Sequence, residues 1–152
     1  LAKKVGISAK LECLRFLTHP RIDRVAWHPD LQYQQMVGAD IGIIPIDRTV
    51  GKGDLGNPFW QVKSENRLTM KMALALPVVA TPIPAYEAVI RNGENGFLAE
   101  SESDWWQALD ALRSTRERQR IGAMGRMAVL EKFSKEAQAR LLIDALRSLV
   151  SK

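Results

Sequence analysis

The chain has 152 residues, of which 46% are hydrophobic and 26% are charged, and its formal net charge is +5. This length predicts one domain with a substantial core, and this composition excludes a chain that is mainly disordered. The cations form no compact block with interleaved aromatic residues, so the net charge favours anionic ligands in general and does not indicate nucleic acid.

The chain offers few groups for disulfide or metal chemistry. Cys13 is the only cysteine, which excludes an intrachain disulfide and a thiolate metal site and fits a reducing cytoplasm. His19 and His28 are too few and too far apart to predict a metal site. The longest apolar run, at 72–80, is far shorter than the roughly 20 residues of a membrane-spanning helix, and no signal peptide is recognisable. We expect a cytoplasmic protein that needs no metal or cofactor.

Predicted helices and strands alternate along the first half of the chain. Leucines at helical spacing predict a helix at 8–17, and a short strand and a short helix are expected at 24–27 and 31–37. The run ADIGIIPI, at 39–46, is typical of a strand that is covered on both faces. A long polar loop with three glycines follows at 47–61, and loops of this length are often functional.

The alternation continues from residue 64 to residue 99. A helix is expected at 64–75, with Leu68, Met72 and Ala75 on its inner face, and a second buried strand is expected at 78–81. A stiff loop at 81–85, a short helix at 86–91 and a last strand at 96–99 complete this part.

The remaining chain is predicted to be helical. Ser101, Ser114 and Ser134 have the spacing of N-terminal caps for three successive helices. Leu141, Ala145 and Leu149 form an apolar stripe on the last helix, and Trp105 and Trp106 are expected in the core.

This pattern predicts an α/β fold, a Rossmann-like three-layer parallel sheet of about four to five strands with extra C-terminal helices. We expect a single domain over 1–152, with the α/β core at about 22–100 and the C-terminal helices at 101–152.

Ligands of open parallel sheets bind beyond the carboxyl ends of the strands. The helix that follows Ser64 begins at that edge, and its N-terminus favours anions. Lys63, Arg67 and Lys71 are four residues apart and repel one another, so a bound phosphate would explain their placement, although a basic row facing solvent is the alternative. Lys52, between two glycines, is a second candidate for a phosphate contact, without the order of a Walker loop.

Four stretches together resemble a known family. They resemble, in the same order and spacing, the C-terminal half of bacterial group 1 glycosyltransferases, which are retaining enzymes of the GT-B fold. The four stretches are ADIGIIPI, NRLTMKMALALPVVATPIPAY, NGENGFLAES and RQRIGAMGRMAVLEKFSKEA. The resemblance covers about residues 25 to 152. It implies a domain that binds a nucleotide-sugar, with the nucleoside-diphosphate-sugar as substrate, and transfer of the sugar to a glycan or lipid-linked acceptor in cell-surface polysaccharide synthesis.

The resemblance also implies roles for individual residues. Asn66 and Arg67 stand near the donor diphosphate, with Lys63 and Lys52 as further phosphate contacts. The base or sugar of the donor is expected near Trp27, His28, Thr81, Pro82, Ala85 and Tyr86. No catalytic residue is identified.

Ala75 stands in place of the family's usual glycine, Pro84 and Ala85 replace a Gly-Gly pair, and Asn92 replaces an acidic residue. Two further departures bear more directly on function. Val62 and Met70 occupy the positions of the family's paired glutamates, the second of which commonly holds the ribose. The N-terminal acceptor domain has no counterpart here, so we expect the chain alone to be inactive. The alternative function is a non-catalytic module for nucleotide-phosphate binding or interaction on the same fold, and a more remote one is half of a sugar-nucleotide epimerase.

Overall fold

The computed structural model describes residues 25–26, 28–48 and 59–150, and the chain divides into two compact units between Gln35 and Met36. In the first unit, the described residues form a turn that leads into helix α2 (Gln32–Val37), which agrees with the helix predicted at 31–37. Residues 25 and 26 lie in no strand, so the strand predicted at 24–27 is not found in the described part of this segment. A four-residue apolar segment carries too little periodicity to identify a strand reliably.

The second unit is built on a parallel sheet. Its described strands are β1 (Gly42–Ile44), β2 (Val78–Ala80) and β3 (Phe97–Leu98), in that spatial order. Ile43 pairs with Val79, which pairs in turn with Phe97. The fold class is confirmed, whereas the three strands among the described residues are fewer than the four to five expected.

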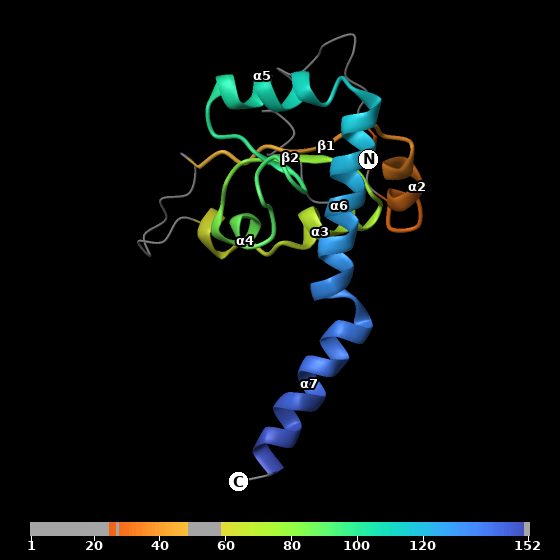
Figure 1. Ribbon diagram of the computed structural model, residues 1–152, viewed down its shortest axis with the longest axis vertical. Helices are drawn as coiled ribbons and strands as arrows, with labels where there is room; N and C mark the ends of the chain where they lie inside the picture. Colours follow the sequence, from red (N-terminus) through yellow and green to blue (C-terminus); the bar gives the residue numbers. More distant parts are fainter. Residues whose placement is uncertain (1–24, 27, 49–58, 151–152) are drawn as a thin grey trace. The chain divides into compact units, whose positions relative to one another are not determined.

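Helices cover both faces of this sheet (Figure 1). One face carries α3 (Asn66–Ala73) and α4 (Pro84–Glu87), and the other carries α5 (Glu102–Ala111). Alternate strand residues serve the two faces, because Val78 and Ala80 join the core under α3 and α4 whereas Val79 joins the core under α5. Helix α6 (Thr115–Phe133) packs against α3, and the short 3-10 helix η3 (Phe59–Val62) contacts α4.

Helix α3 ends in a left-handed residue that is not glycine. Ala75 has a φ of 58°, and the amides of Ala75 and Leu76 donate to the carbonyls of Met72 and Lys71 at 2.9 and 3.2 Å. This is the pair of hydrogen bonds of a Schellman motif. Leu68 and Met72 are fully buried as predicted, but Ala75 is exposed. Its assignment to the inner face is therefore wrong, because the helix has already ended there.

Helix α6 packs directly on this corner. A Cβ on Gly122 would lie 2.0 Å from the carbonyl oxygen of Ala75, and a Cβ on Gly125 would lie 2.9 Å from that of Asn95. The Arg126 guanidinium donates to the carbonyl of Ala73 in the last turn of α3. The glycines of α6 therefore allow a close approach of helix to backbone.

Side-chain amides hold the turn between α4 and β3. Asn92 Oδ1 accepts a hydrogen bond from the amide of Leu98 at 2.9 Å. The carboxylate of an acidic residue at this position could accept the same hydrogen bond. Asn95 is 4% exposed and bridges the Arg91 amide and the Val89 carbonyl at 2.7 and 3.1 Å. Arg120 of α6 donates to the Gly93 carbonyl at 2.9 Å. The turn is thus fixed from both sides.

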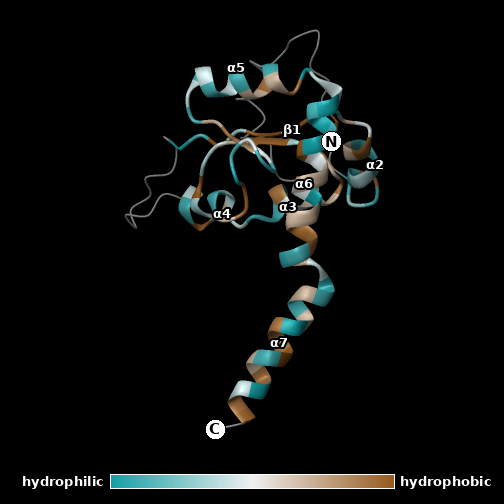
Figure 2. Cartoon of the chain, in the orientation of Figure 1, coloured by the Kyte–Doolittle hydropathy of each residue, from teal (hydrophilic) through white to brown (hydrophobic). Residues whose placement is uncertain are grey.

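The last helix, α7 (Lys135–Val150), has no buried residue. Figure 2 shows hydrophobic and hydrophilic residues in alternating bands along its ribbon. Its predicted stripe exists, but Leu141 is 63% exposed and Leu149 is 70% exposed. Trp106 of α5 is 68% exposed, so its expected place in the core is wrong, whereas Trp105 is partly buried against the core under α5. Across the described ranges, no helix combines the length and apolar character that crossing a bilayer requires.

Candidate ligand-binding edge of the sheet

The carboxyl ends of β1 and β2 are joined by Thr81. Thr81 directly follows β2 and is 8% exposed. Its amide donates to the Ile44 carbonyl at 3.1 Å, and its Oγ1 accepts from the amide of Ile46 at 3.0 Å. The loop after β1 is therefore held against the loop after β2 at the edge where α/β sheets bind ligands.

Arg48 extends this connection to the third strand. Its Nη1 donates to the Pro82 carbonyl at 3.4 Å, and its guanidinium forms an ion pair with Glu100, which lies just after β3. The guanidinium carbon also lies 5.5 Å from the ring centre of Trp60, a distance typical of a cation–π contact. One arginine thus contacts the segments that follow β2 and β3 as well as η3.

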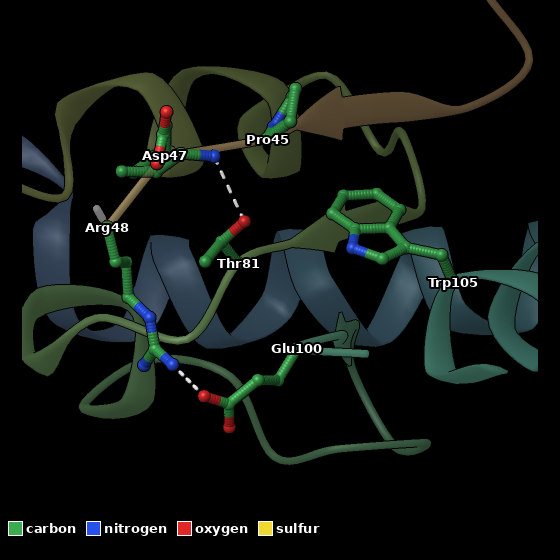
Figure 3. A pocket seen from close by; sticks show the side chains of 7 residues that line it. Pro45, Asp47, Arg48, Thr81, Glu100 and Trp105 are labelled. Atoms are coloured by element: carbon green, nitrogen blue, oxygen red, sulfur yellow. Dashed lines mark hydrogen bonds and ion pairs between the residues drawn. The ribbon is translucent and has the colours of Figure 1, made fainter. Parts of the chain in front are cut away.

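A cavity of about 490 Å³ opens between these segments. Figure 3 shows the Arg48–Glu100 pair on one side of Thr81 and the indole of Trp105 on the other. The cavity is lined by Pro45, Ile46, Asp47, Arg48, Thr81, Glu100 and Trp105. Its volume falls within the range of small-molecule sites.

The start of α3 forms a second feature of the same unit. Its N-cap residue, Glu65, makes no side-chain capping hydrogen bond, and its first turn contains no acidic residue. Asn66 and Arg67 are exposed, and the Lys63 ammonium lies 4.7 Å above the Phe59 ring. Backbone amides, a helix dipole and two cations therefore meet where an anion would be favoured.

The charge of Arg67 acts on two other ionisable groups, the buried Tyr86 and the half-buried Lys71. Burial raises the pKa of Tyr86 above its ordinary value, and the positive charge of Arg67 opposes this shift. Burial lowers the pKa of Lys71, and Arg67 lowers it further. The charge of Arg67 thus acts on the Tyr86 phenol, which belongs to the helix that follows β2.

The row of three cations expected on one helical face is formed only in part. Lys63 precedes the first residue of α3, so it lies outside the helix. The stem of Lys71 covers Gly42, since a Cβ on Gly42 would lie 2.9 Å from Lys71 Cδ. Gly42 begins β1, so the Lys71 stem reaches towards the amino edge of the sheet. Arg67 and Lys71 nevertheless lie one turn apart on α3, and the charge of Arg67 lowers the pKa of Lys71.

The other predicted site residues have different surroundings. Trp27 and Lys52 lie outside the described residues. His28 belongs to the first unit, where its Nδ1 accepts from the amide of Asp30 at 3.2 Å within its own turn. Pro82 is buried, and Ala85 is partly buried against the core under α3 and α4.

The two positions at which the family has carboxylates are occupied by apolar residues, and these differ in exposure to solvent. Val62 is 70% exposed at the end of η3, and Met70 is partly buried on α3. Within the described ranges, no cluster of three or more His, Cys, Asp or Glu side chains is placed to hold a metal ion.

Sequence reasoning missed Arg48, Glu100 and Trp105 as components of the site. In the loop at 47–61 the sequence singles out the glycines and Lys52 but not Arg48, it assigns no role to Glu100, and it places Trp105 in the core. One available signal was position, because Arg48 and Glu100 each follow closely on a predicted strand.

Comparisons with known proteins give matches among solved structures alone. The chain matches no family model and no curated protein sequence. The structure of HepE from Anabaena, in complex with UDP and glucose, superposes with a TM-score of 0.66 at 17% identity, over 97% of this chain and 38% of that one.

A second similar structure is the C-terminal domain of a glycosyl transferase group 1 family protein, LpcC, from Francisella tularensis. It has a TM-score of 0.50 and 21% identity, over 89% of this chain and 64% of that one. The chain thus spans less than two thirds of either structure. At these identities the similarity establishes the fold, which is that of a GT-B glycosyltransferase domain.

Proposed function

We propose that this chain is the donor-binding part of a glycosyltransferase and holds a nucleoside-diphosphate-sugar at the carboxyl edge of its sheet. The observation that carries this proposal is the start of α3, where Arg67 and Lys63 accompany a helix N-terminus without a side-chain cap. The presence of UDP and glucose with HepE, a protein of the same fold, supports the choice of ligand class.

The diphosphate would take the place of the missing cap. Amides of the first turn of α3 and the side chains of Asn66, Arg67 and Lys63 supply the donors. The loop with Thr81, Pro82, Ala85 and Tyr86 is held against the loop after β1 by Thr81 and Arg48, at the carboxyl edge where we propose that the rest of the donor lies. Lys52, Trp27 and His28 stay predicted contacts.

The reaction would be transfer of the sugar to a hydroxyl of a glycan or lipid-linked acceptor. The acceptor oxygen forms a bond to the anomeric carbon, the bond to the diphosphate oxygen breaks, and the hydroxyl proton leaves. Cations and helix amides at the start of α3 would stabilise the charge of the departing diphosphate. We propose that the acceptor-binding site and the groups that assist proton transfer belong to an N-terminal domain. The reaction would then serve a bacterial pathway of cell-surface polysaccharide synthesis.

Calorimetric titration with UDP, GDP and ADP tests this proposal. We expect binding of at least one diphosphate, and Arg67→Ala should weaken it by about 1–3 kcal/mol, as expected for the loss of a charged hydrogen bond. Arg113→Ala is the matched control, because its exposed side chain follows α5, which covers the other face of the sheet, and should leave affinity unchanged. Absence of binding by every diphosphate at millimolar concentration, or equal losses in the two variants, would refute the site.

A second candidate function is a non-catalytic module that binds phosphate groups. Val62 and Met70 favour it, because neither side chain can accept a hydrogen bond from a ribose hydroxyl. Titration with inorganic pyrophosphate separates the two functions. Equal affinity for pyrophosphate and for every nucleoside diphosphate supports the module, whereas a clear preference for one nucleotide supports the donor site.

A further inference from the structure

We propose that Arg48 is a positioning residue of the donor site and acts through Trp60, which fixes the segment that leads into α3. This inference rests on the proposed function, because it concerns the phosphate contacts expected from Lys63 and from the start of α3. It assigns to Arg48 no contact with the ligand. The contacts of Arg48, the burial of Trp60 and the short connection from η3 to α3 carry it.

Arg48 is held from three directions. Its guanidinium carbon lies 5.5 Å from the ring centre of Trp60, its Nη1 donates to the Pro82 carbonyl at 3.4 Å, and its Nη2 pairs with Glu100. The Arg48 side chain is 33% exposed, against 62% for that of Glu100. Because an exposed ion pair alone contributes little, the partly buried contacts with Trp60 and Pro82 are needed to fix this guanidinium.

Trp60 is placed by packing and by this cation. It belongs to η3 and packs against the core under α3 and α4. Its Nε1 is buried, and among the described residues no acceptor lies within hydrogen-bond reach of it. A buried donor without a partner is unfavourable, so hydrogen bonding does not explain the placement of this ring. The aromatic face that it offers to Arg48 does, because a guanidinium is attracted to such a face.

The neighbouring residue of η3 makes a second contact between a cation and a ring. The Lys63 ammonium lies 4.7 Å above the ring of Phe59, which directly precedes Trp60. Residues 63–65 alone separate the end of η3 from the first residue of α3. A shift of Trp60 would therefore also move Phe59, Lys63 and the amides at the start of α3. Arg48 thus holds the segment that presents a cation of the proposed phosphate site.

Attraction of the diphosphate by the charge of Arg48 is a different mechanism. It is disfavoured because the guanidinium is paired with Glu100. Arg48→Lys separates the two mechanisms, since it keeps the charge but replaces a planar fork with a compact ammonium that cannot contact Trp60, Pro82 and Glu100 together. In calorimetric titration of the full chain with UDP, we expect Arg48→Lys to weaken binding about fivefold or more. Attraction by charge alone would leave the affinity of this variant unchanged.

Trp60→Phe and Trp60→Leu form a matched pair on the other side of the contact. Trp60→Phe keeps an aromatic face for Arg48 and removes the unpaired N–H, so UDP affinity should stay within about twofold of wild type. Trp60→Leu removes the aromatic face and should weaken UDP about fivefold or more. In the Trp60→Leu background, Arg48→Lys should cause little further loss, because residues that act as one unit are not additive.

Ser114→Ala controls for lost stability alone. Ser114 caps α6, where its Oγ accepts from the Glu117 amide at 3.4 Å, and its loss should leave UDP affinity unchanged. All variants are compared at a temperature at which circular dichroism shows them to be folded. Wild-type affinity in Arg48→Lys, additive losses in the double variant, or an equal loss in Ser114→Ala would overturn the inference.

The donor site itself is judged by other results of the same titration. If the wild type binds no diphosphate, or if Arg67→Ala binds UDP as tightly as the wild type, the donor site fails and the positioning role fails with it. Binding that is weakened in Arg67→Ala but unchanged in Arg48→Lys and Trp60→Leu would overturn the positioning role alone.

Discussion

Ala75 adopts a backbone conformation that costs an L-residue free energy. Its φ of 58° lies in the left-handed region, where glycine is the usual residue at a helix C-terminus. Ala75→Gly should raise the free energy of unfolding by about 0.5–1 kcal/mol, which is the relief of strain less the greater entropy of glycine in the unfolded chain. Urea denaturation of the two proteins measures the difference, and a less stable variant would contradict the assigned conformation.

Gly122 of α6 lies against the carbonyl group of Ala75, and its substitution should lower the free energy of unfolding. An added Cβ would lie 2.0 Å from the Ala75 carbonyl oxygen, which requires the helix to shift. Gly122→Ala should therefore destabilise the chain by about 1–3 kcal/mol, despite the better helix propensity of alanine.

Gly93→Ala is an informative comparison for Gly122→Ala. Gly93 has a φ of 78° and no atom within 4 Å of an added Cβ, so its substitution tests backbone strain without a steric clash. It should cost about 1 kcal/mol in the same urea experiment. A neutral Gly122→Ala would show that α6 does not pack closely on this corner.

The buried phenol of Tyr86 should make stability depend on alkaline pH. Burial raises its pKa above the ordinary 10.0, so above that pH the folded chain retains a proton that the unfolded chain has lost. The unfolded state then binds fewer protons, and the free energy of unfolding falls as pH rises. The contribution of Tyr86 is fully present below pH 10.0 and is lost as pH rises through the raised pKa.

Comparison of the wild type with Tyr86→Phe isolates this effect. Lys71 acts in the opposite sense, because its lowered pKa makes stability rise with pH below 10.5, but Lys71 is common to both proteins. The difference in unfolding free energy between wild type and Tyr86→Phe should shrink from about pH 9 to about pH 11. A constant difference across that interval would show that the Tyr86 phenol is not desolvated.

Residues of the site were predictable where the local sequence determines their position. Thr81 and Arg67 were expected at the carboxyl edge, because each follows or begins an element with a strong pattern. The pair of Arg48 and Glu100 was not predictable, because their contact depends on the spatial order of three strands and on the packing of Trp60. Composition and spacing contain no information about that convergence.

At the scale of elements, the cap of α5 is a direct test of local sequence signals. Ser101 Oγ accepts from the Asp104 amide at 3.2 Å, and the Asp104 carboxylate accepts from the amides of Ser101 and Glu100 at 2.8 and 3.1 Å. The hydrogen bond from the Ser101 amide is the main reason why the pKa of Asp104 is lowered. This capping box also fixes the backbone of Glu100 beside the cavity.

Ser101→Ala should lower the free energy of unfolding by about 1 kcal/mol, because the first turn of α5 loses its side-chain acceptor. Ser103→Ala is the control, two residues further along the same first turn. Among the described contacts, the Ser103 hydroxyl accepts one hydrogen bond, from the Gln107 side chain at 3.1 Å. Its loss should be within a few tenths of a kcal/mol of zero. Equal losses in urea denaturation would mean that the cap does not stabilise α5.

Caps were predictable and element ends were not, for a physical reason. The signals of Ser101 and Ser114 lie within four residues, and both hydroxyls accept the expected amide, at 3.2 and 3.4 Å. The predicted helix at 64–75 is too long at both ends, since α3 runs from Asn66 to Ala73. At the C-terminal end, the apolar stripe continues past Ala73 although the backbone turns at Ala75. Periodicity describes which face is apolar and not where the hydrogen bonds stop.

At the scale of the molecule, α7 carries an apolar stripe that nothing among the described residues buries. Its exposed apolar side chains are Leu141, Leu142, Ile143, Leu146, Leu149 and Val150. Sequence periodicity identified the stripe correctly but could not show what covers it. The chain spans 38% of HepE and 64% of the LpcC domain structure.

This exposure predicts that α7 is the least protected helix of the second unit. A helix of 16 residues without buried side chains is marginal in water, because most helical stability in proteins comes from packing of an apolar face. In hydrogen exchange of the chain at low concentration, we expect amides of α7 to exchange at least a hundredfold faster than those of α6, a difference of about 2.8 kcal/mol.

Helix α6 is the internal reference, because Ile121 and Val129 anchor it in the two parts of the core. Protection of α7 equal to that of α6 would contradict an uncovered stripe, and loss of that protection on further dilution would identify a second copy of the chain as the cover.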